Sequence, residues 1–558
     1  MRPATIFLTF LILSFYQTGN AASVEIRTAD PVVTHKNSSS GATADRASVG
    51  DFTFTGNERR KSSRTPKRNP RRNRKRRRRA SGGKYSRKNP FPENSDVFTG
   101  ESSAEPVREP HEEQQFFLLR SLLYTVTHFF GGFNRMFENV TDPRDPEKII
   151  YSLPCLNFAG ILMFLSGFGA RRQIGLLLRG NGPSAEKFNA LFNTDECPHG
   201  DTLNAVFRNL RTDEMQEAVT SLSETLIRKK VLYPWRLFGR YFTVAVDGTG
   251  VLTFRERHCR HCLTKKMSNG KILYYHNVLE AKVITTNGFA FSLMTEFIEN
   301  PGENVTKQDC ELKAFYRLAD RLKQRFPRLR ICLSADGLFA GGPTFRLCEK
   351  NGWKYVITLT DKDLPGVNSR FETLSQMESG NRLTFRTGKK AEIRQVFRWV
   401  NDISYEDSYK DEHRVSVVEC TETESHNKDI KINKFKWITN YKIHKGNVIP
   451  LAEGGGRLRW KIENEGFNAQ KNGGFKLEHA YSKDENAGKI FYFLLQIAHI
   501  LFQLIAKGSL FAKAFPKGVG SLKNITFRLA EAWRNLRISP DEIRAMLSEK
   551  LQIRFDTS

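Results

Sequence analysis

The sequence predicts an α/β fold, and three observations support this prediction. Residues 241–250 and 329–337 contain short runs of β-branched, aromatic and aliphatic residues that lead into Asp-Gly, as buried strands do where they enter a turn. Residues 457–467 instead follow the three- and four-residue spacing of a helix. Between them, residues 354–438 contain short alternating patterns separated by polar turns, which indicate further strands. We therefore expect a sheet with helices packed on it.

The first 22 residues have the three-part pattern of a secretory signal peptide. Arg2 precedes an apolar run from Ile6 to Phe15, and the small residues Ala21 and Ala22 follow. One interpretation is an exported protein. The other is an unusual extension, added through an upstream start or a fusion, in front of an intracellular protein.

Residues 23–112 are predicted to be a disordered basic extension. Residues 71–79 are all Arg or Lys except for one Asn, and Pro, Ser and Gly surround them. Such a segment cannot bury apolar surface. It would serve as a non-specific DNA-binding arm or a nuclear-localisation-like patch, or it is a solvated tail with no dedicated role.

Residues 113–238 are predicted to form a helical domain that binds DNA ends. Residues 153–170 are almost continuously apolar, but Pro154 and Asn157 favour a buried helix over a membrane span.

Residues 185–192 and 201–211 are expected to form two short helices, with Asp201 as the N-cap of the second. In a helix-turn-helix arrangement the second helix would direct Asn204, Arg208 and Arg211 toward DNA. Ordinary helical packing is the alternative.

Three acidic residues indicate metal-dependent phosphodiester chemistry. Asp247 and Asp336 each end a predicted strand, and Glu463 shares a helix face with Arg459. Carboxylate oxygens are the ligands that Mg²⁺ prefers, and two ions about 4 Å apart can activate an attacking oxygen and stabilise a leaving one. Arginine can grip a phosphate or hold the neighbouring carboxylate. The pattern therefore indicates a nuclease.

The segments around these acids resemble the DDE transposases of bacterial insertion sequences, in the branch whose last acid lies in Arg-Trp-x-Ile-Glu. The resemblance covers roughly residues 120–510. The segments that carry it are Val246-Asp-Gly-Thr249, Tyr274-Tyr-His-Asn277, Lys307-Gln-Asp-Cys-Glu311, Ala335-Asp-Gly-Leu-Phe-Ala340, Trp437-Ile-Thr-Asn440, Arg459-Trp-Lys-Ile-Glu-Asn-Glu-Gly-Phe-Asn468 and Leu477-Glu-His479.

The resemblance implies a ribonuclease-H-like catalytic core, with Asp247 and Asp336 on adjacent strands and Glu463 on a later helix. These three residues would be the catalytic acids and the ligands of two Mg²⁺ ions, for which Mn²⁺ is an expected substitute. The implied domains are a first core part at 239–350, a β-rich insertion at 351–435, a second core part at 436–512 and a C-terminal helical tail at 513–558.

The implied function is cleavage at transposon ends and strand transfer into target DNA. The partner would be double-stranded DNA, as terminal repeats and as target, bound by a homodimer. No small-molecule substrate and no membrane association are expected. The implied location is the cytoplasm or nucleoid, in conflict with the signal-peptide-like start. A catalytically inactive DNA-binding descendant and an exported protein built on a transposase relic are the alternatives.

Four further residues are candidates for contacts with DNA. Arg459 and Lys471 would contact phosphates. Trp460 can stack on a displaced base, although a tryptophan on the inner face of a helix is more often part of the core. His276 can position a phosphate or a base, with a packed, hydrogen-bonded histidine as the alternative.

The sequence departs from the branch at two auxiliary positions. The branch often carries Tyr three residues before the arginine that corresponds to Arg459, where this sequence has Gly456. It often carries Lys seven residues after the glutamate that corresponds to Glu463, where this sequence has Gln470.

Cys259 and Cys262 form half of a possible zinc site, because Cys and neutral His are the usual zinc ligands. Cys197 and His199 can complete it, but a thiol-bearing loop without metal is the alternative.

The composition agrees with a DNA enzyme of several domains. The chain has 558 residues, of which 39% are hydrophobic, enough for two or three cores. Its net charge of +28 favours a polyanionic partner. Residues 490–506 are predicted to be a helix that covers the core sheet, with Gln496, His499 and Gln503 in a stripe that faces a groove or a solvated channel.

Overall fold

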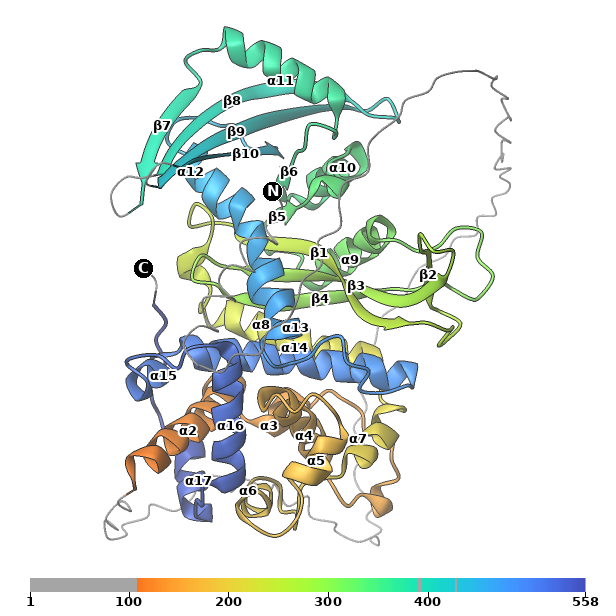
Figure 1. Ribbon diagram of the computed structural model, residues 1–558, viewed down its shortest axis with the longest axis vertical. Coiled ribbons are helices and arrows are strands. Elements are labelled where there is room, and N and C mark those ends of the chain that lie inside the picture. Colours follow the sequence, from red (N-terminus) through yellow and green to blue (C-terminus); the bar gives the residue numbers. More distant parts are fainter. Residues whose placement is uncertain (1–107, 389–392, 427–428, 557–558) are drawn as a thin grey trace, which may run out of the picture. The chain divides into compact units, whose positions relative to one another are not determined.

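The computed structural model describes residues 108–388, 393–426 and 429–556 (Figure 1). The signal-peptide-like segment at 1–22, and the basic extension up to residue 107, lie outside the described residues. The described chain is a mixed α/β protein with one large mixed sheet and many helices.

The centre of the sheet is built from strands that the sequence predicts. β1 (Phe242–Phe254) pairs antiparallel with β3 (Ile272–Ile284) and parallel with β5 (Ile331–Ala335), and β5 pairs parallel with β6 (Lys354–Thr358). All five residues of β5 are buried, as expected of a short apolar run in a covered parallel sheet. β2 (Leu263–Lys266) and β4 (Ala290–Ile298) share the other edge of β3.

The sheet continues into long antiparallel strands beyond β6. Their order is β6-β10-β9-β8-β7, and helix α11 (Pro365–Met377) packs on β8. The strands are β7 (Arg382–Thr387), β8 (Ile393–Glu406), β9 (Glu412–His426) and β10 (Asp429–Thr439). β6 lies within the segment 351–435 that was expected to be the insertion, yet it pairs with the central strand β5.

Most of the helices before β1 form one layer with those at the C-terminus (Figure 1). Trp533 of α16 packs between Phe158 and Phe188, with ring centroids 5.2 and 5.6 Å away. The predicted C-terminal tail thereby completes the N-terminal helical domain. The helices of this layer are α2 (Pro110–Phe130), α3 (Phe133–Met136), α4 (Leu153–Leu165), α5 (Arg172–Leu177), α6 (Pro183–Phe192), α7 (Gly200–Phe207), α15 (Ser509–Ala514), α16 (Leu522–Asn535) and α17 (Pro540–Ser548). Helix α8 (Thr212–Arg228) instead packs directly on β4.

Helix α4 corresponds to the apolar segment predicted at 153–170, and all of its residues except Pro154 are buried. Helix α7 starts two residues earlier than predicted. His199 is its N-cap and accepts a hydrogen bond from the backbone of Asp201, so Asp201 lies in the first turn and is not the cap.

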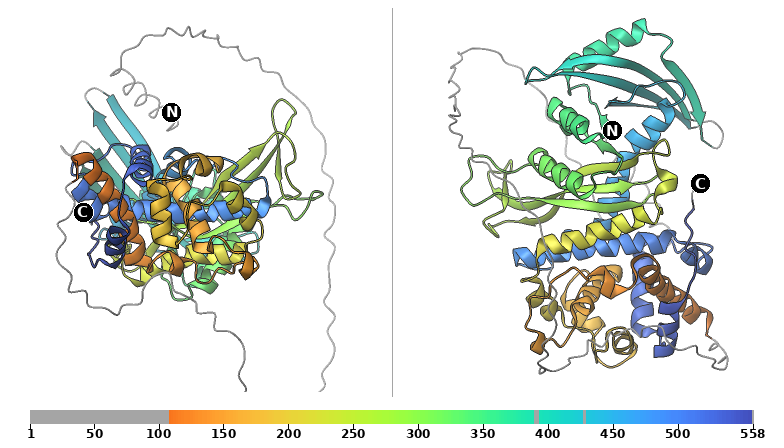
Figure 2. Two further views of the ribbon diagram at one scale, coloured as in Figure 1. Left: turned by 90° about the horizontal axis from the view of Figure 1, so that it is seen from below. Right: turned by 180° about the vertical axis from the view of Figure 1, so that it is seen from behind.

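Helix α14 (Glu485–Lys507) lies between the sheet and the helical layer (Figures 1 and 2). By length and composition it is the one described helix that is suited to crossing a membrane, but 89% of its most apolar window is buried inside the protein. Core helices of soluble proteins have the same property. Its polar stripe of Gln496, His499 and Gln503 is fully buried, so the expectation that the stripe faces a groove or a solvated channel is wrong.

A continuous helical segment from α12 to α13 crosses the sheet and carries Glu463 (Figure 1). It changes between α, π and 3-10 geometry along its length, as helices often do near functional residues. Its parts are α12 (Val448–Leu451), η4 (Ala452–Gly456), η5 (Arg457–Arg459), η6 (Ile462–Asn468) and α13 (Ala469–Asn472). The other helices are η1 (Pro146–Lys148), η2 (Tyr233–Trp235), α9 (Glu311–Arg325), η3 (Gly337–Phe339) and α10 (Gly342–Asn351).

Candidate functional site

Asp247 and Asp336 lie on neighbouring parallel strands. Ala245 of β1 is the register partner of Ser334 of β5, and each acid lies two residues further along its strand direction. Asp247 is within β1, just after its five buried residues, whereas Asp336 follows the end of β5 and caps η3. The two carboxylates therefore lie side by side at one edge of the buried part of the sheet.

Arg459 connects the first acid with the third. Its guanidinium lies 2.6 Å from the carboxylate of Glu463, one helical turn later, and 3.5 Å from the carboxylate of Asp247. The side chains of Arg459 and Asp247 are only 13% and 17% exposed, whereas Glu463 is 48% exposed. Asp247 and Glu463 thus meet at the protein surface around one fixed cation, and Asp336 lies close enough for Arg459 and Glu463 to influence its charge.

The three acids influence one another electrostatically. The pKa of Asp247 is raised to about 7, mainly by burial; Arg459 opposes this shift, whereas the charges of Glu463 and Asp336 contribute to it. The pKa of Asp336 is also raised, mainly by burial. A single arginine therefore does not neutralise the negative charge of this cluster, and the remaining charge favours binding of a further cation.

Two more acids surround the cluster, and sequence reasoning assigned them no role. Glu311, the first residue of α9, faces Gly248, because a Cβ atom there would lie 2.1 Å from its Oε1. Burial and Asp336 raise the pKa of Glu311. Asp363 faces Gly337 in the same way, with 2.3 Å between its Oδ2 and a Cβ atom at that glycine. The sequence feature that could have identified Glu311 as part of the site is its position at the end of the Lys307-Gln-Asp-Cys-Glu311 motif.

These contacts explain why a glycine follows each of the two aspartates. A side chain at either glycine would collide with a carboxylate of the cluster. The donor set consists of carboxylate oxygens, which are ligands for Mg²⁺ or Mn²⁺ and a poor match for soft metals. The residues therefore fit the divalent ions that the sequence leads us to expect.

Trp460 is 49% exposed, so the interpretation that it belongs to the core is wrong. It follows the partly buried Arg459 and lies on the surface side of the helix. Lys471 lies at the far end of the same helical segment, where its amine is 2.8 Å from the carboxylate of Glu478.

The two departures at positions 456 and 470 have a structural reason. A Cβ atom at Gly456 would lie 2.4 Å from Cε2 of Trp437, so this position has no room for a side chain. Gln470 is buried and donates to Gln496 at 2.8 Å. Both positions serve the packing of the helix here.

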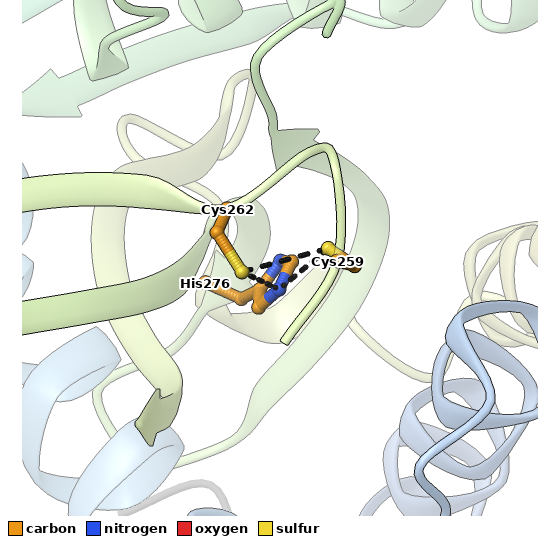
Figure 3. A group of neighbouring side chains, drawn as sticks. All are labelled: Cys259, Cys262 and His276. Carbon is orange, nitrogen blue, oxygen red and sulfur yellow. Dashed lines mark hydrogen bonds between the residues drawn. The ribbon is translucent and has the colours of Figure 1, made fainter. Parts of the chain in front are cut away.

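His276 belongs to a different cluster. Its Nε2 lies 3.3 Å from Sγ of Cys259 and 3.4 Å from Sγ of Cys262 (Figure 3). Cys197 and His199 are not part of this group, so the expectation that they complete a site with the cysteine pair is wrong.

The predicted recognition helix is only partly available to DNA. Asn204 is buried, so its predicted orientation toward DNA is wrong. Arg208 and Arg211 are exposed, with Arg211 2.6 Å from Asp213. Helical packing accounts for the inward face of α7.

Residues 134–222 match the family model described as DDE_Tnp_1-associated. This segment runs from α3 into α8 and precedes all three acids. The sequence matches no curated protein. The family match points to a transposase-related family.

Proposed function

We propose that the chain is a DDE-type transposase that cleaves DNA at transposon ends and joins the freed ends to target DNA. The observation that carries this proposal is the meeting of Asp247, Asp336 and Glu463 around Arg459. The transposase-associated match of residues 134–222 supports it from a separate part of the chain.

The strand order supports a ribonuclease-H-like core. β4, β3, β1, β5 and β6 are neighbours in this order, with β3 antiparallel to β1 and β1, β5 and β6 parallel. The β7–β10 sheet with α11 lies between β6 and the helix of Glu463, where the family resemblance implies an insertion. Two acids at adjacent strands and a third on a later helix suit such a core.

Asp247, Asp336 and Glu463 would hold two Mg²⁺ ions, or Mn²⁺ in their place. When bound, the metal supplies charge stabilisation for the attacking and leaving oxygens. Arg459 orients Asp247 and Glu463 through its two ion pairs. Glu311 and Asp363 add negative charge that keeps cations at this edge of the sheet.

The DNA would run across the surface of the helix that carries Glu463. Trp460 is exposed beside the site and suits stacking on an unpaired base. Lys471 forms a surface ion pair with Glu478, which a DNA phosphate can replace at small cost. Action on two DNA ends would require a homodimer, and the substrate would place the protein in the cytoplasm or nucleoid.

The test is cleavage of DNA that flanks the coding sequence, by the full chain, with Mg²⁺ or with EDTA. We expect metal-dependent nicking by the wild type and its loss in Asp336→Asn. Asp320→Asn is the matched control, because Asp320 is an exposed acid of α9. Binding without nicking would contradict a working transposase and favour an inactive DNA-binding descendant.

A further inference from the structure

A second group of metal-binding side chains lies on the hairpin that continues β1. Cys259 and Cys262 are in the loop between β1 and β2, and His276 is on β3 (Figure 3). In the part of the chain that the structure describes, this is the one group of His, Cys and acidic ligand atoms within 4.8 Å of one another. None of its members contributes to the acidic cluster.

The distances fit one tetrahedral zinc ion. The two sulfurs are 3.5 Å apart, and they lie 3.3 and 3.4 Å from Nε2 of His276. Zinc binds sulfur at about 2.3 Å and nitrogen at about 2.0–2.1 Å, so tetrahedral ligand atoms are about 3.5–3.8 Å apart. A shift of a few tenths of an ångström therefore converts this group into three corners of a zinc site.

The surrounding structure holds the ligands in place before any metal binds. The side-chain amide of Asn300 donates to the backbone carbonyl of Cys262 at 2.9 Å, and the backbone carbonyl oxygen of Asn300 lies 2.7 Å from Nδ1 of His261. The other ring nitrogen of His276 faces Glu299, 4.0 Å away. A carboxylate behind a histidine favours the tautomer whose Nε2 carries the free electron pair that a metal needs.

Glu485 is the candidate for the fourth ligand, and its side chain would have to move toward the group, because its carboxylate does not lie within 4.8 Å of all three ligand atoms. It begins α14, and it lines the same small cavity as His276. Its carboxylate also lies 3.9 Å from Nε2 of His261 in the cysteine loop. An acid at this place can close the tetrahedron and leave the ion without an open position.

We propose that Cys259, Cys262 and His276, with Glu485 as the fourth ligand, bind a structural zinc ion. The ion would join the β1–β2 loop to β3 and to the start of α14. Leu252 of β1 is the register partner of His276, and the same strand carries Asp247. The loop also presents three exposed arginines, Arg255, Arg257 and Arg260, whose positions the zinc would fix.

The test is the zinc content of the full chain, purified with a reductant and measured by elemental mass spectrometry after gel filtration. We expect one zinc per chain in the wild type and its loss in Cys259→Ser, Cys262→Ser and His276→Gln. Cys310→Ser, which removes an exposed free cysteine, should keep the zinc. Glu485→Gln should lose zinc to a chelator at concentrations that the wild type withstands.

Cobalt replacement of the zinc in the wild type gives a measurement that does not depend on variants that fold poorly. Thiolate-to-cobalt charge-transfer bands with tetrahedral d–d bands are expected. A zinc-free wild type after zinc addition, cobalt spectra without thiolate bands, or a Cys259–Cys262 disulfide that persists in protein purified with a reductant would each overturn the proposal. Zinc content is independent of DNA cleavage, so the two proposals fail separately.

Discussion

The guanidinium of Arg459 lies 3.5 Å from the carboxylate of Asp247, a contact that joins the helix of the third acid to the strand of the first. The same guanidinium is 2.6 Å from Glu463. Both acids depend on one cation for their relative position.

We expect Arg459→Gln to lower metal-dependent DNA cleavage by about 100-fold, because a small misplacement of catalytic groups has an effect of this size. Arg459→Lys should be intermediate, since lysine keeps the charge but not the planar fork that reaches two carboxylates. Nicking rates under single-turnover conditions measure both.

Arg457→Gln is the control on the same helical segment. Arg457 pairs with Glu422 and not with the acids of the site. Its loss should leave the nicking rate nearly unchanged, and an equal loss of activity in both glutamine variants would contradict a specific role of Arg459.

Gly456 should tolerate no side chain. Gly456→Ala places a Cβ atom 2.4 Å from the indole of Trp437, and overpacking of this kind costs about 1–3 kcal/mol of the free energy of unfolding. The midpoint of urea unfolding measures the change. Gly488→Ala in α14 is the control, because nothing lies within 4 Å of its Cβ position and alanine favours helices by up to about 1 kcal/mol. Equal midpoints for the two variants would contradict the predicted clash.

The central strands and the places of the three acids on these elements were predictable because their signals are local. A buried strand that ends in Asp-Gly has a recognisable pattern, and Arg459 and Glu463 are one helical turn apart. The sequence also predicted the buried α4 from its nearly continuous apolar run.

Features that depend on contacts between distant segments could not be predicted in the same way. His276 meets Cys259 and Cys262 because β3 returns beside β1, and the spacing of the cysteines does not contain that information. The buried polar stripe of α14 is similar. Polar residues on a helix suggest a solvated face, but here Gln503 and Gln496 find their partners on other segments.

His499 should make stability depend on pH. Burial, together with Lys282, lowers its pKa from 6.5 to about 3, against a hydrogen bond of the ring to the backbone of Glu465 that raises it. The amides of Gln470 and Gln503 lie 3.1 Å from its Nδ1, which suits a neutral ring. The unfolded chain therefore binds a proton that the folded chain excludes.

The sign follows from this difference in protonation. The contribution of His499 to the free energy of unfolding is fully present above pH 6.5. It is lost as the pH falls toward 3, by about 1.4 kcal/mol per pH unit. At pH 5 the loss is about 2 kcal/mol. His499→Gln should remove this part of the slope when unfolding is compared at pH 7.5 and 5. Equal slopes in the two proteins would contradict a buried neutral His499.

Removal of one partner of the buried Glu280–Lys282 ion pair should destabilise the fold more than removal of both. Both side chains are 0% exposed and their charged atoms are 3.1 Å apart. Tyr492 of α14 donates to Glu280 at 2.7 Å, and Lys282 donates to Gln496 at 2.7 Å. The pair therefore joins the strand beside Asp247 to the central helix.

Lys282→Met leaves the Glu280 carboxylate without its cation, and we expect it to lower the free energy of unfolding by about 3–5 kcal/mol. Glu280→Gln removes the other partner and should have an effect of similar size. The double variant should recover much of either loss, because no unpaired buried charge remains. A double-mutant cycle on urea unfolding at pH 7.5 measures the coupling. Additive effects would contradict the pairing, since independent sites add within about 0.5 kcal/mol.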